Sequence, residues 1–191
     1  MNHKNIDPAR LAAAHACGLK DSELAELFGA SRSTIKRRRE TLGLPGNCPR
    51  NTTGKLGEQL VAAYLTGQGF KVTPIGGHNP PSDLLVNGWR VDVKASRDVE
   101  TLRSGLTSVQ FRLPSLRSSN MSEYRHRKDY QRDTDFFALA ALAGQEMTHL
   151  YLLPVSRWQG TITVHPDSPF CPFQPYRGNV APLRSKGAAA A

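Results

Sequence analysis

Two aspartates and a lysine stand close together within residues 82–94. Asp83 and Asp92 flank Asn87-Gly88, and Asn-Gly between two apolar runs is the strongest short-range signal for a two-residue β-hairpin turn. Counting outward from this turn places Asp83 opposite Asp92, with Lys94 further along the same face. Opposed carboxylates repel each other. The pair becomes favourable when a divalent cation lies between the two acids, as in Mg²⁺ sites that bind a nucleic-acid backbone.

The same register gives the hairpin one apolar face and one chemical face. The apolar face comprises Leu84, Val86, Trp89, Val91 and Val93. On the chemical face, the Lys94 ammonium can reach a bound water or a phosphate oxygen, which is the arrangement of a nuclease centre. The alternative is a solvent-facing hairpin whose acids pair with Lys94 and Arg90.

The segment before the hairpin supplies a third acid. A helix is expected from about Thr53 to Thr66, ended by Gly67 and Gly69, with a broad apolar arc toward a sheet. Glu58 falls at the rim of that arc, so its carboxylate can reach the sheet edge where the hairpin acids lie. The alternative for Glu58 is an ordinary exposed acid.

Further apolar segments complete the predicted sheet. Strands are expected at residues 70–74, 107–113, 135–142, 149–153 and 161–164. The prediction is therefore an α/β fold, a mixed β-sheet core flanked by helices.

The composition restricts the partners. The 191 residues carry a formal net charge of +9, which indicates a polyanionic partner. We expect no membrane association, because no apolar run reaches the roughly 18 residues of a spanning helix and the N-terminus lacks a signal-peptide core. The chain has 3 cysteines, widely spaced, which argues against a disulfide framework or zinc site and favours a reducing cytosol.

Residues 1–45 predict a small all-α domain. Helices are expected at 8–16, 23–28 and 32–42, each followed by a glycine. The spacing of Ala25, Gly29 and Ile35 is what a helix-turn-helix requires: a small residue at the helix crossing, a glycine in the turn and an apolar residue packing back.

The third of these helices is strongly basic. Its predicted DNA-binding residues are Arg32, Ser33, Thr34, Lys36, Arg37, Arg38 and Arg39. The first turn would face base edges in the major groove, and the later arginines would meet phosphates. The segment resembles the helix-turn-helix modules of site-specific recombinases and transcription regulators. The alternative is a helical bundle used for dimerisation or packing.

Four short motifs in the second part of the chain carry a family resemblance. They are Gly57-Glu58, Gly69-Phe70, Pro81-Ser82-Asp83 and Val91-Asp92-Val93-Lys94. In this order they resemble the PD-(D/E)xK nuclease superfamily, which includes Holliday junction resolvases and restriction-type endonucleases. The resemblance departs from the usual pattern where Ser82 replaces a proline and Asp92 replaces the commoner glutamate.

The resemblance implies a specific assignment of the acids and the lysine. Asp83 and Asp92 would be metal ligands with Glu58 as a supporting acid, and Lys94 would position water or stabilise charge. The implied cofactor is Mg²⁺, with Mn²⁺ able to substitute. Residues 130–139 and 150–155 extend the similarity toward the branch with intron-encoded homing endonucleases, so that it covers about residues 54–156.

The remaining segments are a linker, a basic stretch and a tail. Residues 46–53 are predicted to be a linker, residues 54–165 the nuclease domain, and residues 166–191 a proline-rich irregular tail. Within 112–132, Arg125, Arg127 and Lys128 are expected to grip DNA, and the alternative is a solvated loop.

Taken together, the sequence predicts a Mg²⁺-dependent endonuclease acting on double-stranded DNA. It would act as a homodimer or higher symmetric oligomer, because one active site cuts one strand. We expect a prokaryotic cytosolic or nucleoid protein, with a phage or mobile element as an alternative source. The rival hypotheses are a Holliday junction resolvase, a modification-dependent or mismatch-nicking enzyme, and a DNA-binding regulator with an inactive nuclease fold.

Overall fold

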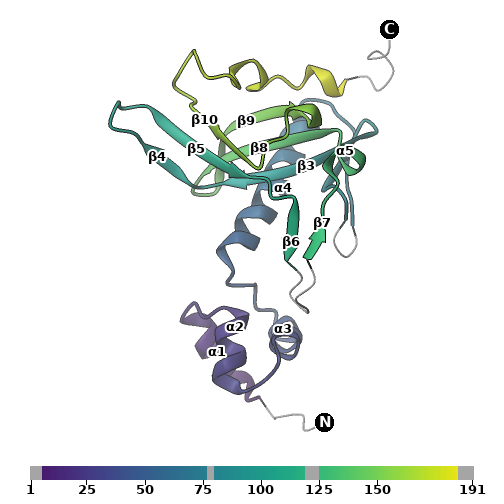
Figure 1. Ribbon diagram of the computed structural model, residues 1–191. Coiled ribbons are helices and arrows are strands. Elements are labelled where there is room, and N and C mark those ends of the chain that lie inside the picture. Colours follow the sequence, from purple (N-terminus) through teal and green to yellow (C-terminus); the bar gives the residue numbers. More distant parts are fainter. Residues whose placement is uncertain (1–5, 77–79, 119–124, 185–191) are drawn as a thin grey trace. The chain divides into compact units, whose positions relative to one another are not determined.

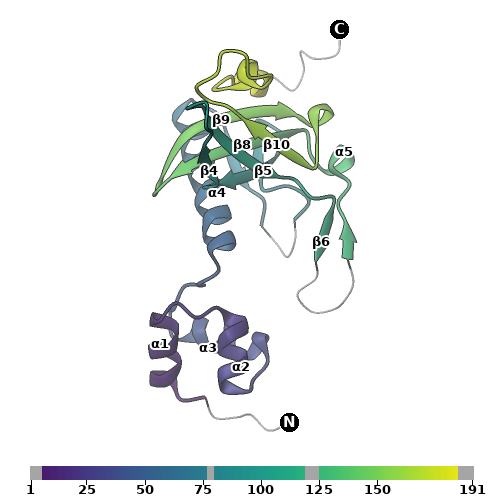
Figure 2. The same cartoon turned by 60° about the vertical axis from the view of Figure 1, so that its left-hand side comes forward.

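The structure is a computed structural model that describes residues 6–76, 80–118 and 125–184. The chain divides into two compact units, Met1–Thr52 and Thr53–Ala191, which are considered separately below. Figures 1 and 2 show the course of the chain through the helices and strands of each unit.

Three short helices form the first unit. They are α1 (Pro8–Ala16), α2 (Asp21–Phe28) and α3 (Arg32–Thr41). Leu11, Leu24 and Ile35, one from each helix, are fully buried together. This small apolar core explains why the three helices pack into one body, since none is long enough to be stable alone.

The ends of these helices follow from local chemistry. The Asp7 carboxylate accepts a hydrogen bond from the Ala9 N–H at 2.9 Å, and the Ser31 hydroxyl accepts one from the Thr34 N–H at 3.1 Å. Gly29 ends α2 in the left-handed conformation at φ 57°. The sequence predicted α1 and α3 closely, but α2 begins at Asp21 rather than at residue 23.

Arg39 corrects one of the predicted DNA contacts. Its side chain is buried, and its guanidinium donates hydrogen bonds to both Asp21 oxygens, at 2.9 and 3.3 Å, and to the Leu44 carbonyl. This ion pair joins α3 to the start of α2. The prediction that Arg39 binds phosphate is therefore wrong, because the group is committed inside the unit.

The predicted linker, residues 46–53, is more ordered than expected. The Asn47 side chain donates to the His15 carbonyl at 2.7 Å, and the His15 ring lies 2.6 Å from the Pro45 carbonyl oxygen. Residues 45–47 thus pack against α1. The long helix α4 (Pro49–Gly67) then begins four residues earlier than predicted.

A five-stranded mixed sheet organises the second unit. Its order is β1-β2-β3-β8-β9, with β3 parallel to β8 and the other pairs antiparallel. The strand bounds are β1 (Val72–Pro74), β2 (Leu84–Val86), β3 (Trp89–Ser96), β8 (Phe136–Ala143) and β9 (Glu146–Pro154). A mixed sheet with flanking helices confirms the predicted α/β class.

The β2–β3 hairpin has the predicted register. Leu84 pairs with Val91, Leu85 with Arg90 and Val86 with Trp89. The two turn residues adopt positive φ angles, 48° at Asn87 and 86° at Gly88, as a two-residue turn of this kind requires.

The sheet is covered on both faces, and the helix α4 lies over one of them (Figure 1). Successive residues of β8 face opposite sides: Ala138 and Ala140 pack with α4, while Phe137 and Leu139 belong to a second core. That second core includes strands of a smaller sheet, ordered β10-β5-β4. These strands are β4 (Val99–Thr101), β5 (Thr107–Arg112) and β10 (Thr161–Val164).

The remaining elements are short. A small hairpin, β6 (Leu116–Ser118) and β7 (Arg125–Arg127), is followed by α5 (Tyr130–Asp133). Three 3₁₀ turns, Val155–Arg157, Gln174–Tyr176 and Ala181–Leu183, lie in the C-terminal part. Cys171, Val180 and Leu183 are buried in the cores, so the described part of the proline-rich tail packs against this unit.

Among the described residues, none of the helices combines the length and the apolar character needed to cross a membrane.

The Arg39–Asp21 pair predicts that substitution of Arg39 lowers the stability of the first unit more than substitution of Arg38. Arg39→Ala should destabilise the first unit by about 1 to 3 kcal/mol, because it leaves a partly buried carboxylate and a carbonyl without their donor. Arg38→Ala, which removes an exposed side chain of the same helix, serves as the matched control. Hydrogen exchange of the α1–α3 amides measures the difference, and equal protection in the two variants would contradict this prediction.

Candidate active site

The chemical face of the hairpin brings Asp83, Asp92 and Lys94 together. Asp83 lies one residue before β2, where its N–H donates to the Val91 carbonyl at 3.1 Å and its Oδ2 accepts from the Val93 N–H at 2.7 Å. These two bonds fix Asp83 beside Asp92, which lies between Val91 and Val93 on β3. The Lys94 ammonium donates to Asp92 Oδ2. The predicted gathering of the two acids and the lysine is thus present.

Asp92 is the most enclosed member of the group. Its side chain is fully buried, and each of its carboxylate oxygens contacts a lysine. Lys94 contacts Oδ2, and Lys128 lies 3.1 Å from Oδ1. A buried charge is stable only when it is paired in this way.

Lys128 is a site residue that the sequence did not identify. It was predicted only as part of a basic DNA-gripping stretch, yet its side chain is only 10% exposed and points to Asp92. The ammonium also lies 4.8 Å from the centre of the Tyr130 ring. No spacing rule could have found it, because Lys128 is 36 residues from Asp92 and reaches it only through the tertiary fold.

Arg90 is not a partner of the hairpin acids. Its guanidinium forms two hydrogen bonds with Asp135, at 2.8 and 3.2 Å, and its N–H donates to the same carboxylate at 2.8 Å. Asp135 stands at the start of β8, so this pair ties the two parallel strands together. In the alternative the hairpin acids pair with Lys94 and Arg90. The Arg90 pairing is wrong, whereas the pairing of Lys94 with Asp92 is present.

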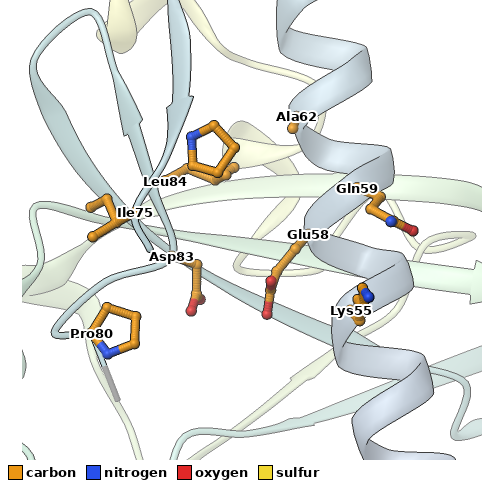
Figure 3. A pocket seen from close by; sticks show the side chains of 9 residues that line it. Lys55, Glu58, Gln59, Ala62, Ile75, Pro80, Asp83 and Leu84 are labelled. Atoms are coloured by element: carbon orange, nitrogen blue, oxygen red, sulfur yellow. The ribbon is translucent and has the colours of Figure 1, made fainter. Parts of the chain in front are cut away.

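Glu58 reaches the site from α4. Figure 3 shows its carboxylate and that of Asp83 extending into the same pocket, which has a volume of about 390 Å³ and also holds Lys55 and Pro80 in its wall. Partial burial raises the pKa of Glu58, and the negative charge of Asp83 raises it further. The prediction that Glu58 approaches the hairpin acids is confirmed.

Close packing of α4 against β3 sets the position of Glu58. Gly57 lies directly over Ala95, whose Cα is 3.5 Å from where a Cβ on Gly57 would stand, and that Cβ would overlap the Ala95 methyl group. Only glycine permits this approach. Glu58 follows Gly57 on the helix and Lys94 precedes Ala95 on the strand, so this contact holds both residues close to where α4 meets β3.

Burial raises the pKa of Asp83, and the neighbouring Asp92 charge raises it further. Lys94, the Val93 N–H and Lys128 act in the opposite direction but do not offset the first two effects. The positive charge around Asp83 is therefore too small to stabilise its ionised form fully. A bound cation would supply the missing positive charge.

The donor set fits a hard divalent cation, with one correction. Carboxylate oxygens are the ligands that Mg²⁺ prefers, and Mg²⁺ keeps several waters, so two acids suffice. In the described part of the chain, however, no three His, Cys, Asp or Glu side chains are close enough to hold an ion together. The expected three-carboxylate set of Glu58, Asp83 and Asp92 is thus not assembled, and a cation would use Asp83 and Asp92.

The predicted DNA-binding residues fall into several groups. Five of them are exposed on α3: Arg32, Ser33, Lys36, Arg37 and Arg38. Thr34 is partly buried, and its hydroxyl lies 2.8 Å from that of Ser31. Arg127, the last residue of β7, is exposed. The side chain of Arg125 lies outside the described part of the structure.

Comparison with solved structures finds a similar fold in a bacterial homing endonuclease, I-Ssp6803I. The match has a TM-score of 0.54 at 21% sequence identity, and covers 75% of this chain and 98% of the other. No protein-family model matches the sequence, and no curated protein matches it. At this identity the likeness establishes a shared fold and nothing more.

The Gly57–Ala95 contact gives a testable consequence for site geometry. Gly57→Ala should destabilise the second unit by about 1 to 3 kcal/mol through overpacking. The double variant Gly57→Ala with Ala95→Gly should recover most of that loss, because the second change removes the overlapping methyl group. Thermal unfolding of the four proteins of this double-mutant cycle measures the coupling.

Gly54→Ala is the matched control for helix propensity. Gly54 lies in the same helix as Gly57, and nothing lies within 4 Å of the methyl group that this substitution adds. It should be neutral or stabilising by up to about 1 kcal/mol. Equal destabilisation by the two glycine substitutions, or no recovery in the double variant, would show that the contact does not set the helix position.

The raised pKa of Asp83 predicts a stability gain when its charge is removed. Since the folded protein holds the Asp83 proton more tightly than the unfolded chain, this group lowers stability as pH rises through the window between the two pKa values. Asp83→Asn keeps an acceptor for the Val93 N–H, so it should raise the melting temperature at pH 8. The gain should vanish near pH 3, where the wild-type group is also neutral, and a loss of stability at pH 8 would contradict the argument.

Proposed function

We propose that the chain is a Mg²⁺-dependent DNA endonuclease of the PD-(D/E)xK superfamily, of homing or restriction type. The observation that carries this proposal is the meeting of Asp83, Asp92 and Lys94 at one end of a rigid hairpin, with Glu58 beside them. The similar fold of a homing endonuclease supports the same reaction class.

Each residue has a chemical task in this proposal. Asp83 and Asp92 would hold the divalent cation, which when bound neutralises phosphate charge and lowers the pKa of water. Lys94 extends its ammonium from the same face of β3 and would stabilise the negative charge that develops on the phosphate. Glu58, whose raised pKa makes it a better proton acceptor than a solvated glutamate, would orient the attacking water.

The α3 helix would select or hold the duplex. Its exposed side chains include three arginines and one lysine on a helix capped by Ser31, and such a surface neutralises phosphates and reads base edges in the major groove. We therefore propose a helix-turn-helix function for the first unit, carried by Arg32, Lys36, Arg37 and Arg38 without Arg39.

A double-strand break requires two active sites facing opposite strands. Each chain contains one set of Asp83, Asp92 and Lys94. We therefore propose that the active form is a homodimer or a higher symmetric assembly.

Substitution of the central residues separates cleavage from binding. Asp83→Ala and Lys94→Ala should each reduce Mg²⁺-dependent nicking of supercoiled plasmid by at least about 100-fold, as expected when a transition-state-stabilising group is lost. Their affinity for DNA in EDTA should change less than about threefold, because most duplex affinity comes from distributed phosphate contacts. Asp98→Ala, an exposed acid just beyond β3, is the control.

Retained Mg²⁺-dependent cutting in both variants would refute the site assignment. Absence of cutting by the wild-type protein on linear, supercoiled and four-way-junction DNA would instead favour a DNA-binding protein with an inactive nuclease fold. Preference for the junction over the linear duplex would favour a resolvase.

A further inference from the structure

Lys128 occupies an oxygen of Asp92 that the proposed cation also needs. We propose that Lys128 is a displaceable counter-ion: its ammonium holds the Asp92 carboxylate in the metal-free protein, leaves when a divalent cation binds, and then contacts a DNA phosphate. This inference rests on the proposed function, but its main test does not require cleavage.

The two lysines on Asp92 differ in how they are attached. Lys94 belongs to the same strand, and its ammonium also donates to the Val93 carbonyl at 3.2 Å. Its own strand and this second bond therefore hold Lys94 beside the acid. Lys128 comes from outside the sheet, between β7 and α5, and its ammonium contacts Asp92 Oδ1 and lies over the Tyr130 ring. Because Lys128 is not part of β3, its ammonium can move away from Asp92 while the strand that carries Asp92 and Lys94 stays in place.

The backbone at Lys128 is held in place. The Lys128 main-chain N–H donates to the Ser115 carbonyl at 2.8 Å. The adjacent Tyr130 is buried, and its hydroxyl donates to the Pro114 carbonyl at 3.1 Å. Displacement thus requires rotation of a four-carbon side chain and no rearrangement of the backbone.

Charge balance indicates why displacement is needed. Asp92 has two carboxylate oxygens, and both contact ammonium groups. A cation that takes Asp83 and Asp92 as ligands must remove at least one of these contacts. Its two positive charges also replace the neutralising effect of Lys128, so the buried acid is not left unpaired.

Lys128 also lines a groove with a volume of about 420 Å³. Three basic residues, Arg127, Lys128 and Arg132, and one acid, Asp129, are among its lining residues. Arg132 is paired with Asp133, whereas Arg127 is exposed. An ammonium released from Asp92 therefore turns toward a surface suited to a phosphate of the DNA backbone.

Cation affinity in the absence of DNA tests the displacement directly. In calorimetric titrations with Ca²⁺ or Mg²⁺, Lys128→Met should bind the cation roughly tenfold or more tightly than wild type, because no buried ion pair must first be broken. Lys128→Arg, which keeps the charge, should bind no more tightly than wild type. Lys55→Met removes a cation that faces Glu58 without touching Asp92, so it reports the general effect of one lost charge and should change affinity only about twofold.

DNA affinity tests the second half of the proposal. With Ca²⁺ as the bound cation, Lys128→Met should weaken duplex binding about fivefold, because the released ammonium is then missing from the phosphate. In EDTA, where Asp92 holds Lys128, the loss of duplex affinity should be below about twofold. The same loss in both conditions would overturn the phosphate contact.

Unchanged or weaker cation binding by Lys128→Met, or an equal gain in Lys55→Met, would overturn the displacement. Circular dichroism and the melting temperature establish that each variant is folded, and a misfolded Lys128→Met is replaced by Lys128→Gln under the same criteria. If Asp92→Asn binds the cation as tightly as wild type, the proposed metal site itself fails. If Asp92→Asn loses the cation while Lys128→Met is unaltered, only this inference fails.

Discussion

Burial of the Asp92 carboxylate is the constraint on which the site depends. A fully buried acid must be paired, and here two ammonium groups from different parts of the chain meet it. Asp83 beside it has no such full compensation, and its pKa is raised accordingly. The protein therefore maintains a concentration of negative charge that its own lysines neutralise only in part. Such an arrangement lowers stability, and perturbed carboxylates of this kind cluster at functional sites.

The fold serves this constraint by holding a small number of backbone positions rigidly. The Asn87-Gly88 turn fixes which residues of β2 and β3 oppose each other, and the Val93 N–H orients the Asp83 carboxylate. The Arg90–Asp135 pair joins β3 to β8 nearby, and the Gly57–Ala95 contact brings α4 close enough to present Glu58. All of these are local contacts around a single strand, β3, which is the central strand of the five-stranded sheet. These contacts together place the acids of the candidate site rigidly.

Sequence reasoning succeeded where the determining interactions are local and failed where they are not. The hairpin register was predictable because the turn residues require positive φ, and the alternation of side chains then follows by counting. Glu58 was predictable from helical periodicity. Arg39 was misassigned because a run of arginines on one helix appears equally exposed, while Asp21, its partner, lies 18 residues earlier. Lys128 was identified only as a basic residue, since its contact with Asp92 exists only in the folded chain.

The central claim is that Asp83 and Asp92 together bind a divalent cation. Anomalous diffraction from crystals of the wild-type protein grown with Mn²⁺ tests it most directly, since Mn²⁺ prefers the same oxygen ligands as Mg²⁺ and is visible by its anomalous signal. The account predicts one strong peak within coordination distance of both carboxylates, with Lys94 retained nearby. A peak elsewhere, or no peak and Asp92 still enclosed by both lysines at saturating Mn²⁺, would contradict it.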